Sequence, residues 1–501
     1  MMQANSTVEV TIPAPQVEIQ ILQSPYDKPI KAIGFIDTGA TKTMLNPEVL
    51  PDDAWRTHYE YFQAADGQKF STSLITKKPI GIRFFPECII WLHVIGSKLH
   101  GRDLLIDAPA PYADISNKLK QCCADSHADF KHPHPLWKNP EFFIQLPFKL
   151  NEDANPIKAS HPGMTPDDLV LAREECNQLL ALGLIEPTKS NWACPAFYVN
   201  KRTEQIRGKK RLVIDYKALN HFLLDDKFPL PKTKVLFSYL AKAQIFSKFD
   251  LKSGFWQLGI DPNDRYKTAF CLPNAQYQWT VMPFGLKVAP SLFQKAMIKI
   301  FEPILHTTLI YIDDILLYTQ DQPTHAKLLQ QFYDIVQAHG VMLSDKKSFI
   351  GQPNIDFLGM KFIDGRYQPG PHITQELLKF PEENLTTKEI QQFLGIVNYI
   401  KDFIPECSRY TSQLSKLLKK EPPPWGQVQT MALQKLKQVC QQPLPLKIPG
   451  TGHRILQTDA SNEFWGAILI EEENGRKHFC GHASGQFKDS EKHYHAVYRR
   501  F

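Results

Sequence analysis

Two adjacent carboxylates stand inside an apolar stretch, "LIYIDDILLYT" at residues 309–319, and this pair constrains the fold more than any other feature. Neighbouring side chains of one strand point to opposite faces of its sheet, so Asp313 and Asp314 stay together only if the chain turns there. We therefore predict a β-hairpin with Asp313 and Asp314 as its two-residue tip. A bare acidic turn on the surface would be the simpler interpretation of this pattern alone.

A third carboxylate occupies a similar position in the chain. Asp250 follows the apolar run "IFSKF", and "DLKSGFWQLGI" and "LIYIDDILLYT" are both predicted to form strands. Carboxylates at the ends of neighbouring strands provide the hard oxygen ligands that Mg²⁺ prefers, and bound cations cancel the repulsion between like charges. Two such ions would hold the attacking and leaving oxygens of a phosphoryl transfer. We therefore predict a magnesium site at Asp250, Asp313 and Asp314.

Length and composition limit the number of domains and the classes of partner that the chain can have. At 501 residues, with 43% hydrophobic and 22% charged side chains, the chain has material for about three domains. Its net charge of +6 permits a polyanionic partner without requiring one. The nine cysteines lack the spacing of zinc ligands, which favours free thiols in a reducing, cytoplasmic compartment. No apolar run approaches the roughly 18 residues of a membrane span, so we expect no membrane partner.

Hydrophobic periodicity and capping residues divide the chain into regions. Short alternating runs predict strands over residues 8–107. The Pro- and His-rich stretch that follows, over residues 109–164, is aperiodic and is interpreted as a linker or wrapping segment. Further on we predict a helix over 165–185 with Thr165 as its N-cap, a helix over 386–404 capped by Thr386 or Thr387, and a hairpin over 453–472.

Five further motifs follow one another along the chain. They are "FDLKSGFWQLGI", "RYKTAF", "QYQWTVMPFGLKVAPSLFQKAM", "YIDDILLY" and "IDFLGM". In content and order they resemble the motifs of reverse transcriptases, within a match that spans residues 164–420. Their sequences are most similar to those of plant pararetroviruses (Caulimoviridae, on the badnavirus and tungro-virus side), with gypsy-type LTR retrotransposons next. The resemblance implies an RNA- and DNA-directed DNA polymerase whose partners are an RNA or DNA template–primer and deoxynucleoside triphosphates.

The resemblance also implies roles for individual positions. The three aspartates would hold Mg²⁺, and Phe255 would be the steric gate against a ribose 2′-hydroxyl, although its pattern alone also fits a core residue. Lys346 or Lys347 matches the lysine proposed to protonate the leaving pyrophosphate, and either one also fits a solvated charge. The other implied contacts are to the triphosphate by Arg211 with Lys210, to the incoming nucleotide by Phe284 and Gly285, and to the primer by Tyr311 and "FLGM".

A second motif, "IGFIDTGATKTML", places Asp37 before Thr-Gly-Ala between apolar strands. Aspartic proteases need two such carboxylates sharing one proton to activate water, and this chain has one Asp-Thr-Gly. It resembles a retropepsin, which completes its site by homodimerisation and would act on a polyprotein. "LHGRDLLID" resembles the family's Gly-Arg-Asp segment, although His100 stands where an apolar residue is usual, and Gly67 is expected at the flap tip. A β domain with an incidental Asp-Thr-Gly is the alternative.

A third stretch, "LQTDASNEFWGAIL", resembles the first strands of a ribonuclease H domain, with Asp459 as its first metal ligand. Glu491 begins the next match to that family, but the position of the expected catalytic Glu is occupied by Arg500 or lies beyond the end. A one-base frameshift in an intact ancestor, or a wrong gene-model boundary, would produce this "YRRF" ending. We therefore expect an incomplete and inactive ribonuclease H. Residues from about 446 should be poorly ordered, because two strands cannot bury their apolar faces alone.

Together these features predict a multidomain chain with an all-β retropepsin-like domain, an α+β right-hand polymerase and a truncated α/β ribonuclease H-like domain. It is expected in the cytoplasm, in virus-like particles or the host cell. Two rivals are an inactive endogenous viral relic that at most binds nucleic acid, and a chain in which only the protease acts. The predicted boundaries are 1–112 for the protease, 113–164 for a linker, 165–375 for fingers and palm, 376–445 for the thumb or connection, and 446–501 for the partial ribonuclease H.

Overall fold

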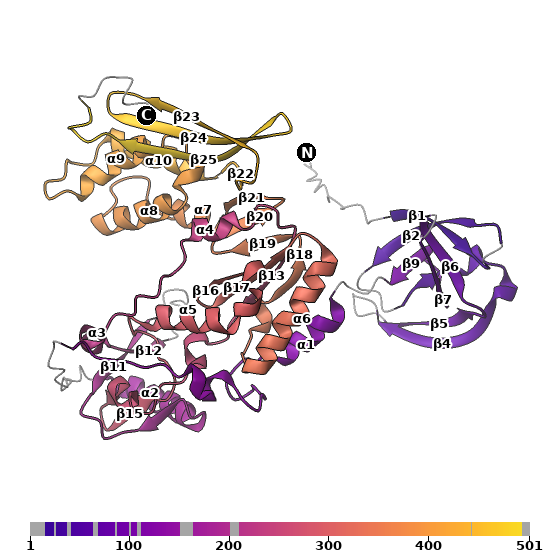
Figure 1. Cartoon of the computed structure of the whole chain (residues 1–501), viewed down its shortest axis with the longest axis horizontal. Coiled ribbons are helices and arrows are strands. Elements are labelled where there is room, and N and C mark those ends of the chain that lie inside the picture. The colour runs from indigo at the N-terminus through magenta and orange to yellow at the C-terminus, as the bar shows by residue number, and fades with distance from the viewer. Residues whose placement is uncertain are drawn as a thin grey trace, which may run out of the picture. The chain divides into compact units, whose positions relative to one another are not determined.

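The structure is a computed structural model, and its chain divides into two compact units, Met1–Ala113 and Asp114–Phe501 (Figure 1). Each unit is described by itself. The described residues are 16–24, 27–37, 42–63, 69–85, 88–99, 102–107, 112–150, 164–200, 210–441 and 443–492.

The first unit is a β domain, as the alternating runs predict. In its first strand the residues Ile19 and Ile21 are buried while Glu18 is exposed, so one face of the sheet builds a core. The nine strands lie in the order β4-β5-β8-β3-β9-β2-β1-β6-β7. Their bounds are β1 Gln16–Leu22, β2 Ile30–Asp37, β3 Met44–Leu45, β4 Trp55–Gln63, β5 Lys69–Thr76, β6 Ile80–Phe85, β7 Cys88–Leu92, β8 Ile95–Gly96 and β9 Leu104–Asp107.

The second unit begins its α/β part with a capped helix and a five-stranded sheet. Helix α2 (Pro166–Ala181) starts where predicted, because the Thr165 hydroxyl accepts a hydrogen bond from the Asp168 amide at 3.2 Å. The sheet has the order β10-β15-β14-β11-β12. Its strands are β10 Ile185–Pro187, β11 Cys194–Asn200, β12 Lys210–Ile214, β14 Phe270–Leu272 and β15 Ala275–Trp279, and helix α3 (Lys217–Phe222) follows β12.

The central sheet carries the acidic motifs. Its order is β16-β17-β13-β18, and the stacked rings of Phe249 and Phe332, 4.4 Å apart, pack helix α6 against it. The predicted strand "DLKSGFWQLGI" differs from the structure, since the strand ends at Asp250 and a short 3-10 helix, η6 (Gly254–Gln257), follows. The bounds are α4 Thr233–Ser238, β13 Ile245–Asp250, α5 Ala289–Ile300, β16 Thr308–Tyr311, β17 Asp314–Thr319, α6 Gln322–His339 and β18 Phe349–Gln352.

A third sheet and four helices follow. Thr386, rather than Thr387, caps α8 in a full capping box with Glu389. The sheet order is β19-β20-β21-β22, so a strand from beyond the helices closes it. The bounds are β19 Asn354–Phe357, β20 Met360–Ile363, β21 Arg366–Pro369, α7 Pro371–Leu378, α8 Thr387–Tyr399, α9 Cys407–Ser415, α10 Gln427–Gln441 and β22 Leu446–Lys447.

The last sheet has three strands, one more than the sequence predicts. They are β23 (His453–Ala460), β24 (Phe464–Glu473) and β25 (Arg476–Gln486), and Figure 1 shows them as a layer beside α9 and α10. Ser408 on α9 holds β25 through two hydrogen bonds to Ser484, at 2.9 and 2.8 Å. The sequence analysis predicts poor order from about residue 446, but the structure forms a three-stranded sheet there. Strand β25 and helix α9 supply packing that two strands alone would lack.

The predicted linker over residues 113–164 also differs from the structure. Helix α1 (Ala113–Gln121) and two short 3-10 helices, η3 (Leu136–Lys138) and η4 (Pro140–Phe142), pack on the second unit. Leu136 is fully buried. Helix α1 buries Ile115 and Leu119 on one face. After α1 the segment is held by isolated backbone bridges, which leave no periodic pattern in the sequence.

Two further expectations concern thiols and membranes. All eight cysteines whose side chains are described are free, and burial raises the pKa of several, that of Cys123 to about 12. Among the described residues, no helix is both long enough and apolar enough to cross a membrane.

Candidate active site

The register of two adjacent strands brings the acidic motifs together. Asp250, the last residue of β13, lies directly opposite Asp314, the first residue of β17. Asp314 also pairs with Tyr311 at the end of β16, so the turn of the β16–β17 hairpin is Ile312–Asp313. The predicted Asp313–Asp314 tip is therefore corrected by one residue. The Asp313 carbonyl accepts a hydrogen bond from the Leu251 amide at 3.1 Å, which ties the turn to β13.

A buried glutamine that the sequence analysis missed fixes this turn. Ile312 adopts φ 54°, which is strained for a β-branched residue. The Gln294 side chain accepts from the Ile312 amide at 2.7 Å and donates to the Ile310 carbonyl at 3.0 Å. Gln294 is only 1% exposed. The sequence does contain a sign of this role. Gln294 lies on the otherwise apolar, buried face of α5, "APSLFQKAMIKI", where a polar amide is unexpected.

The Asp313 carboxylate is buried and incompletely bonded. Its Oδ1 atom has no hydrogen-bond partner in the structure. A Cβ atom added to Gly254 would lie 2.0 Å from that oxygen, so only glycine leaves room for it. Burial is the first cause, and the charges of Asp250 and Asp314 the second, that raise the pKa of Asp313 to about 7. A buried oxygen of this kind needs a proton or a cation.

Two lysines face the other two carboxylates. Lys347 lies 3.0 Å from Asp250, and Lys248, which the sequence analysis missed, lies 3.4 Å from Asp314. Lys346 instead faces Asp125 at 3.8 Å. In the part of the chain that the structure describes, no group of three His, Cys, Asp or Glu side chains has metal-binding geometry. Even so, three carboxylates with one unpartnered oxygen suit a hard divalent cation in their chemistry.

Aromatic side chains cluster around Phe255 and Phe284. Phe255 lies on η6, with its ring 5.3 Å from that of Phe284 and 5.5 Å from that of Phe293. The Arg211 guanidinium lies 5.4 Å from the Phe284 ring centre. Gly285 has φ 97°, a conformation that side chains rarely adopt. Residues of β12, η6 and the loop before α5 thus lie close together.

The remaining predicted polymerase residues lie in two other surroundings. Lys210 forms an ion pair with Asp168 at 2.6 Å. Tyr311 packs, partly buried, against the core that contains Phe357 and Met360. Between those two residues the "FLGM" turn carries Leu358, whose carbonyl accepts a hydrogen bond from the Tyr399 hydroxyl on α8. The turn is thereby tied to the first long helix after the third sheet.

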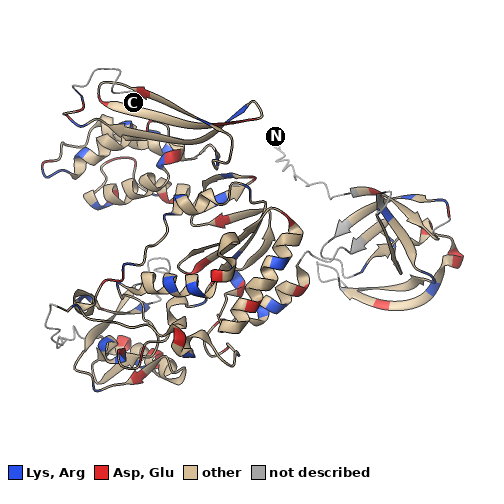
Figure 2. Ribbon diagram, in the orientation of Figure 1, with Lys and Arg blue, Asp and Glu red and all other residues tan. Residues whose placement is uncertain are grey.

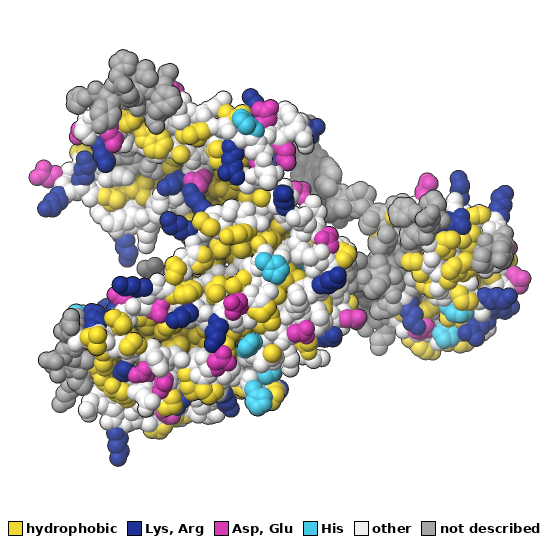
Figure 3. All heavy atoms as spheres, viewed as in Figure 1, with side chains coloured by type: hydrophobic (Ala, Val, Ile, Leu, Met, Phe, Trp, Pro, Cys, Tyr) yellow, Lys and Arg dark blue, Asp and Glu magenta, His cyan; other side chains and the backbone are white. Residues whose placement is uncertain are grey.

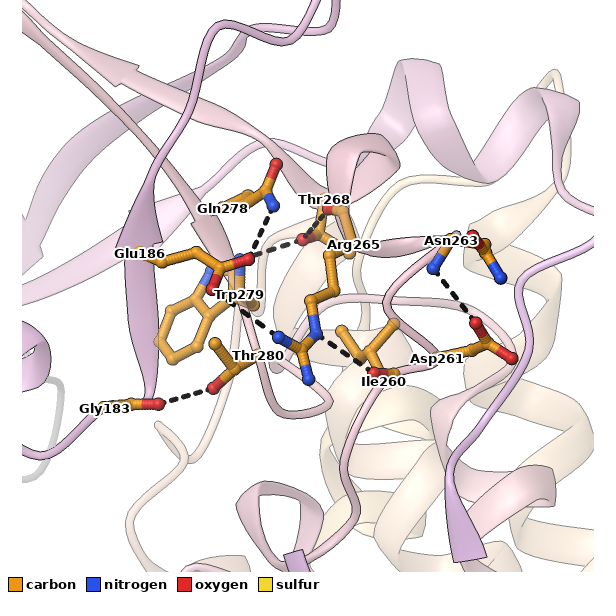
Figure 4. Close-up of polar contacts among 10 residues, drawn as sticks. All are labelled: Gly183, Glu186, Ile260, Asp261, Asn263, Arg265, Thr268, Gln278, Trp279 and Thr280. Atoms are coloured by element: carbon orange, nitrogen blue, oxygen red, sulfur yellow. Dashed lines mark hydrogen bonds and ion pairs between the residues drawn. The ribbon is translucent and has the colours of Figure 1, made fainter. Parts of the chain in front are cut away.

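A polar network anchors the segment that leaves η6, as Figure 4 shows. The Arg265 guanidinium donates to the Ile260 carbonyl at 3.1 Å and pairs with Glu186 at 3.5 Å. Glu186 also accepts from Gln278 at 2.7 Å. Strands β10 and β15 are thus linked to the chain a few residues beyond Phe255.

The two other predicted acids lie in separate places. Asp37 ends β2, with its backbone opposite Asp107 of β9, while its side chain and residues 38–41 lie outside the described part. Gly67 and His100 also lie outside it. Asp459 lies on β23 and is exposed. A cavity of about 930 Å³ between this sheet and α9 is lined by Asp459, together with Glu406, Arg409 and His482.

Basic and acidic positions alternate on the viewed face of the second unit. Figure 2 marks basic positions in blue on α1, α5 and α6, and Figure 3 shows Lys and Arg side chains interspersed with acidic ones on that face. This mixture agrees with the modest net charge of +6.

Comparisons with known proteins agree with this geometry. Residues 199–362 match the family described as "Reverse transcriptase (RNA-dependent DNA polymerase)", and residues 425–501 match the "RNase H-like domain found in reverse transcriptase". The chain is 52% identical to the genome polyprotein of Petunia vein clearing virus (isolate Shepherd), over 98% of this chain and 24% of that protein. It is 37% identical to the enzymatic polyprotein of Cauliflower mosaic virus (strain Strasbourg), over 76% of this chain and 56% of that protein.

A solved structure shares the architecture. The foamy viral protease-reverse transcriptase in complex with an RNA/DNA hybrid matches with a TM-score of 0.62 at 18% identity, over 97% of this chain and 67% of that one. Fold and sequence together define a reverse transcriptase domain that follows a protease-like β domain and precedes a ribonuclease H-like region. The chain belongs with the caulimovirus-like polyproteins that carry these domains, and spans 24% to 56% of the two relatives named above.

Proposed function

We propose that this chain polymerises DNA on RNA and DNA templates from a primer 3′-hydroxyl. The observation that carries the proposal is the unpartnered Asp313 oxygen, buried beside Asp250 and Asp314 in a turn that Gly254 leaves room for. Reverse transcriptases generally use a divalent metal, and these three carboxylates would hold Mg²⁺. Bound there, the ions would neutralise charge on the transferring phosphate.

Other side chains of the site bind and orient the substrates in this proposal. Arg211, next to Phe284, would grip the triphosphate, and Lys210 would assist by leaving Asp168. Phe255 would fill the space of a ribose 2′-hydroxyl and so select deoxynucleotides. Lys347, already 3.0 Å from Asp250, would supply the proton or charge that the leaving pyrophosphate needs. The primer end would rest near Tyr311 and the "FLGM" turn, with Gly285 close to the incoming nucleotide.

Primer extension on an RNA template with deoxynucleotides and Mg²⁺ tests the proposal. The parent chain should extend the primer, and Asp313→Asn should lose extension by roughly a thousandfold or more while still binding template–primer. Asp345→Asn, an exposed acid near the site, serves as the control. No extension by a folded parent that binds template–primer would favour the relic, which at most binds nucleic acid.

For the two flanking domains the proposal is narrower. The β domain would be an aspartic protease that pairs with a second copy through Asp37 and cuts a polyprotein. Peptide cleavage that depends on concentration and disappears in Asp37→Asn would support this. We propose that the ribonuclease H-like region, with Asp459 as its one assigned metal ligand, does not cleave RNA. Hydrolysis of the RNA strand of a hybrid, lost in Asp459→Asn, would contradict that.

A further inference from the structure

We infer that residues 122–148, here called the strap, position the Phe255 turn and thereby tune nucleotide selection. The inference rests on the proposed function, because it concerns the sugar specificity of that polymerase. The strap belongs to the Pro- and His-rich segment that precedes α2, and it lies against the palm rather than between domains.

The strap is fastened to the backbone on both sides of the site. At its start, Leu343 donates to the Cys122 carbonyl at 2.9 Å and Ala124 donates back to the Leu343 carbonyl at 3.2 Å. Further along, Ile144 donates to the Gly259 carbonyl and Asp261 to the Ile144 carbonyl, both at 2.9 Å. These paired bonds are β-bridges, so the strap is held in one register on the segments that flank η6.

Glycine marks both places where the strap approaches most closely. A Cβ atom on Gly259 would lie 2.4 Å from the Phe143 ring and 2.7 Å from the Trp137 carbonyl. A Cβ atom on Gly340 would lie 2.2 Å from the His134 carbonyl. Such contacts leave no space for any larger residue, so the strap and the palm fit only with these two glycines.

Between these fastenings, an aromatic group of the strap reaches the gate turn. The ring of His127, which is 9% exposed, lies 4.6 Å from Trp137 and 5.9 Å from Trp256. Trp256 directly follows Phe255 on η6, and its ring lies 5.9 Å from Phe284. Phe255 in turn lies 5.3 Å from Phe284. The strap therefore packs on Trp256, which adjoins the gate residue on η6 and shares the Phe284 ring with it.

The helix η6 has little support of its own. It spans four residues, Gly254–Gln257. Its one deep polar anchor is Gln257, which is fully buried and bonds both the amide and the carbonyl of Met342 at 2.8 Å. Leu136 of the strap donates to the Gly340 carbonyl at 3.0 Å, two residues before that anchor. The strap thus braces the anchor as well as Trp256.

A steric gate works only if its ring cannot retreat. Side-chain displacement of about 1 Å can change rates on the order of a hundredfold. If Trp256 loses its backing, Phe255 gains room to move, and ribonucleotides should be accepted more often. Removing the backing should raise the ratio of ribonucleotide to deoxynucleotide kcat/KM on the order of tenfold.

The experiment uses the full chain and four strap variants. Trp137→Leu and His127→Leu remove rings that contact each other, and His127 contacts Trp256. Phe142→Leu is the matched control, because its ring packs on His339, 5.5 Å away, within the same strap. Trp137→Phe should restore discrimination. Thermal melting and template–primer affinity show that each variant is folded and loaded.

A double-mutant cycle separates a gate effect from general damage. If the strap acts through Phe255, Trp137→Leu should add nothing to the ratio in a Phe255→Val chain. Unchanged ratios in both folded strap variants, or equal losses with both sugars, would overturn the inference alone. An unchanged ratio in Phe255→Val would overturn the gate role of Phe255 and the inference with it, while leaving the polymerase in place. No extension by the parent would overturn the proposed function itself.

Discussion

Two carboxylates in this chain, each with a buried oxygen, show how differently their partners offset the cost of burial. Asp313 in the palm turn has an oxygen without a partner, and its pKa is raised to about 7. Glu471 on β24 is fully buried, yet its Oε1 accepts from the Gly450 and Gly452 amides at 2.9 and 2.8 Å. Its Oε2, although without a hydrogen bond, lies 3.0 Å from the Lys447 ammonium, whereas in the described part of the chain no such cation lies beside Asp313 Oδ1.

The pKa of Glu471 is lowered, because these partners outweigh the opposing effect of burial. The protein thus stabilises the charge on Glu471 and leaves that on Asp313 uncompensated. A satisfied buried acid holds structure together, whereas an unsatisfied one among other acids is the better candidate for binding a cation.

The largest effect should follow from disturbing the space around Asp313. Gly254→Ala would place its Cβ 2.0 Å from Asp313 Oδ1, so the carboxylate or η6 must move. We expect primer extension to fall by roughly a hundredfold to a thousandfold. Gly481→Ala on β25 is the control, because nothing lies within 4 Å of its added Cβ. Near-normal extension by Gly254→Ala would mean that Asp313 does not need this position.

The second effect concerns Glu471. Glu471→Gln leaves the Lys447 ammonium, with its side chain 18% exposed, without its buried partner. The free energy of unfolding should fall by about 3 kcal/mol, with the loss in amide-exchange protection centred on β23–β25. Glu473→Gln is the matched control, since it removes a half-exposed partner of the same lysine and should cost less than about 1 kcal/mol. Equal costs would show that burial of Glu471 is unimportant.

The sequence predicts only part of this sheet and of the central turn. The sequence predicts the hairpin of β23 and β24. Strand β25, "RKHFCGHASGQ", has an irregular burial pattern, and its pairing with β24 shifts register between Leu469 and Ile470, so periodicity did not reveal it. The adjacent aspartates and Asp250 predicted the central turn correctly except for one residue. That shift depends on Gln294, a tertiary contact that no local pattern contains. The strap was missed for a similar reason.

The third effect is a dependence of stability on pH. Between the ordinary Asp pKa of about 3.9 and about 7, the folded chain binds a proton at Asp313 that the unfolded chain has lost. The free energy of unfolding should therefore fall by a few kcal/mol as pH rises through this window, when no divalent metal is present. Glu471 has the opposite sign, and its contribution is lost at acidic pH. Denaturant titrations in chelator should show the slope in the parent and a weaker one in Asp313→Asn.

The smallest effect distinguishes the two neighbouring lysines. The charge of Lys347 lowers the pKa of Asp313, whereas burial and the neighbouring carboxylates raise it. Lys347→Met should therefore raise the pKa of Asp313 further and widen its difference from Glu471. Because the Lys347 side chain is 66% exposed, solvent screens it, and the Asp313 titration should move up by only about a few tenths of a pH unit. Carbon NMR of the Asp313 carboxyl group would measure this shift.

Lys346→Met is the control, since Lys346 faces Asp125 and lies 82% exposed. It should leave the Asp313 titration in place. If the Asp313 titration moved in Lys346→Met and stayed in place in Lys347→Met, Lys346 would be the lysine that acts at the site. The sequence motif "LSDKKSF" leaves that choice open, because adjacent lysines are equivalent until the turn after Ser344 directs one of them at Asp250. The direction of the backbone after Ser344 therefore decides that Lys347, and not Lys346, faces the acidic cluster.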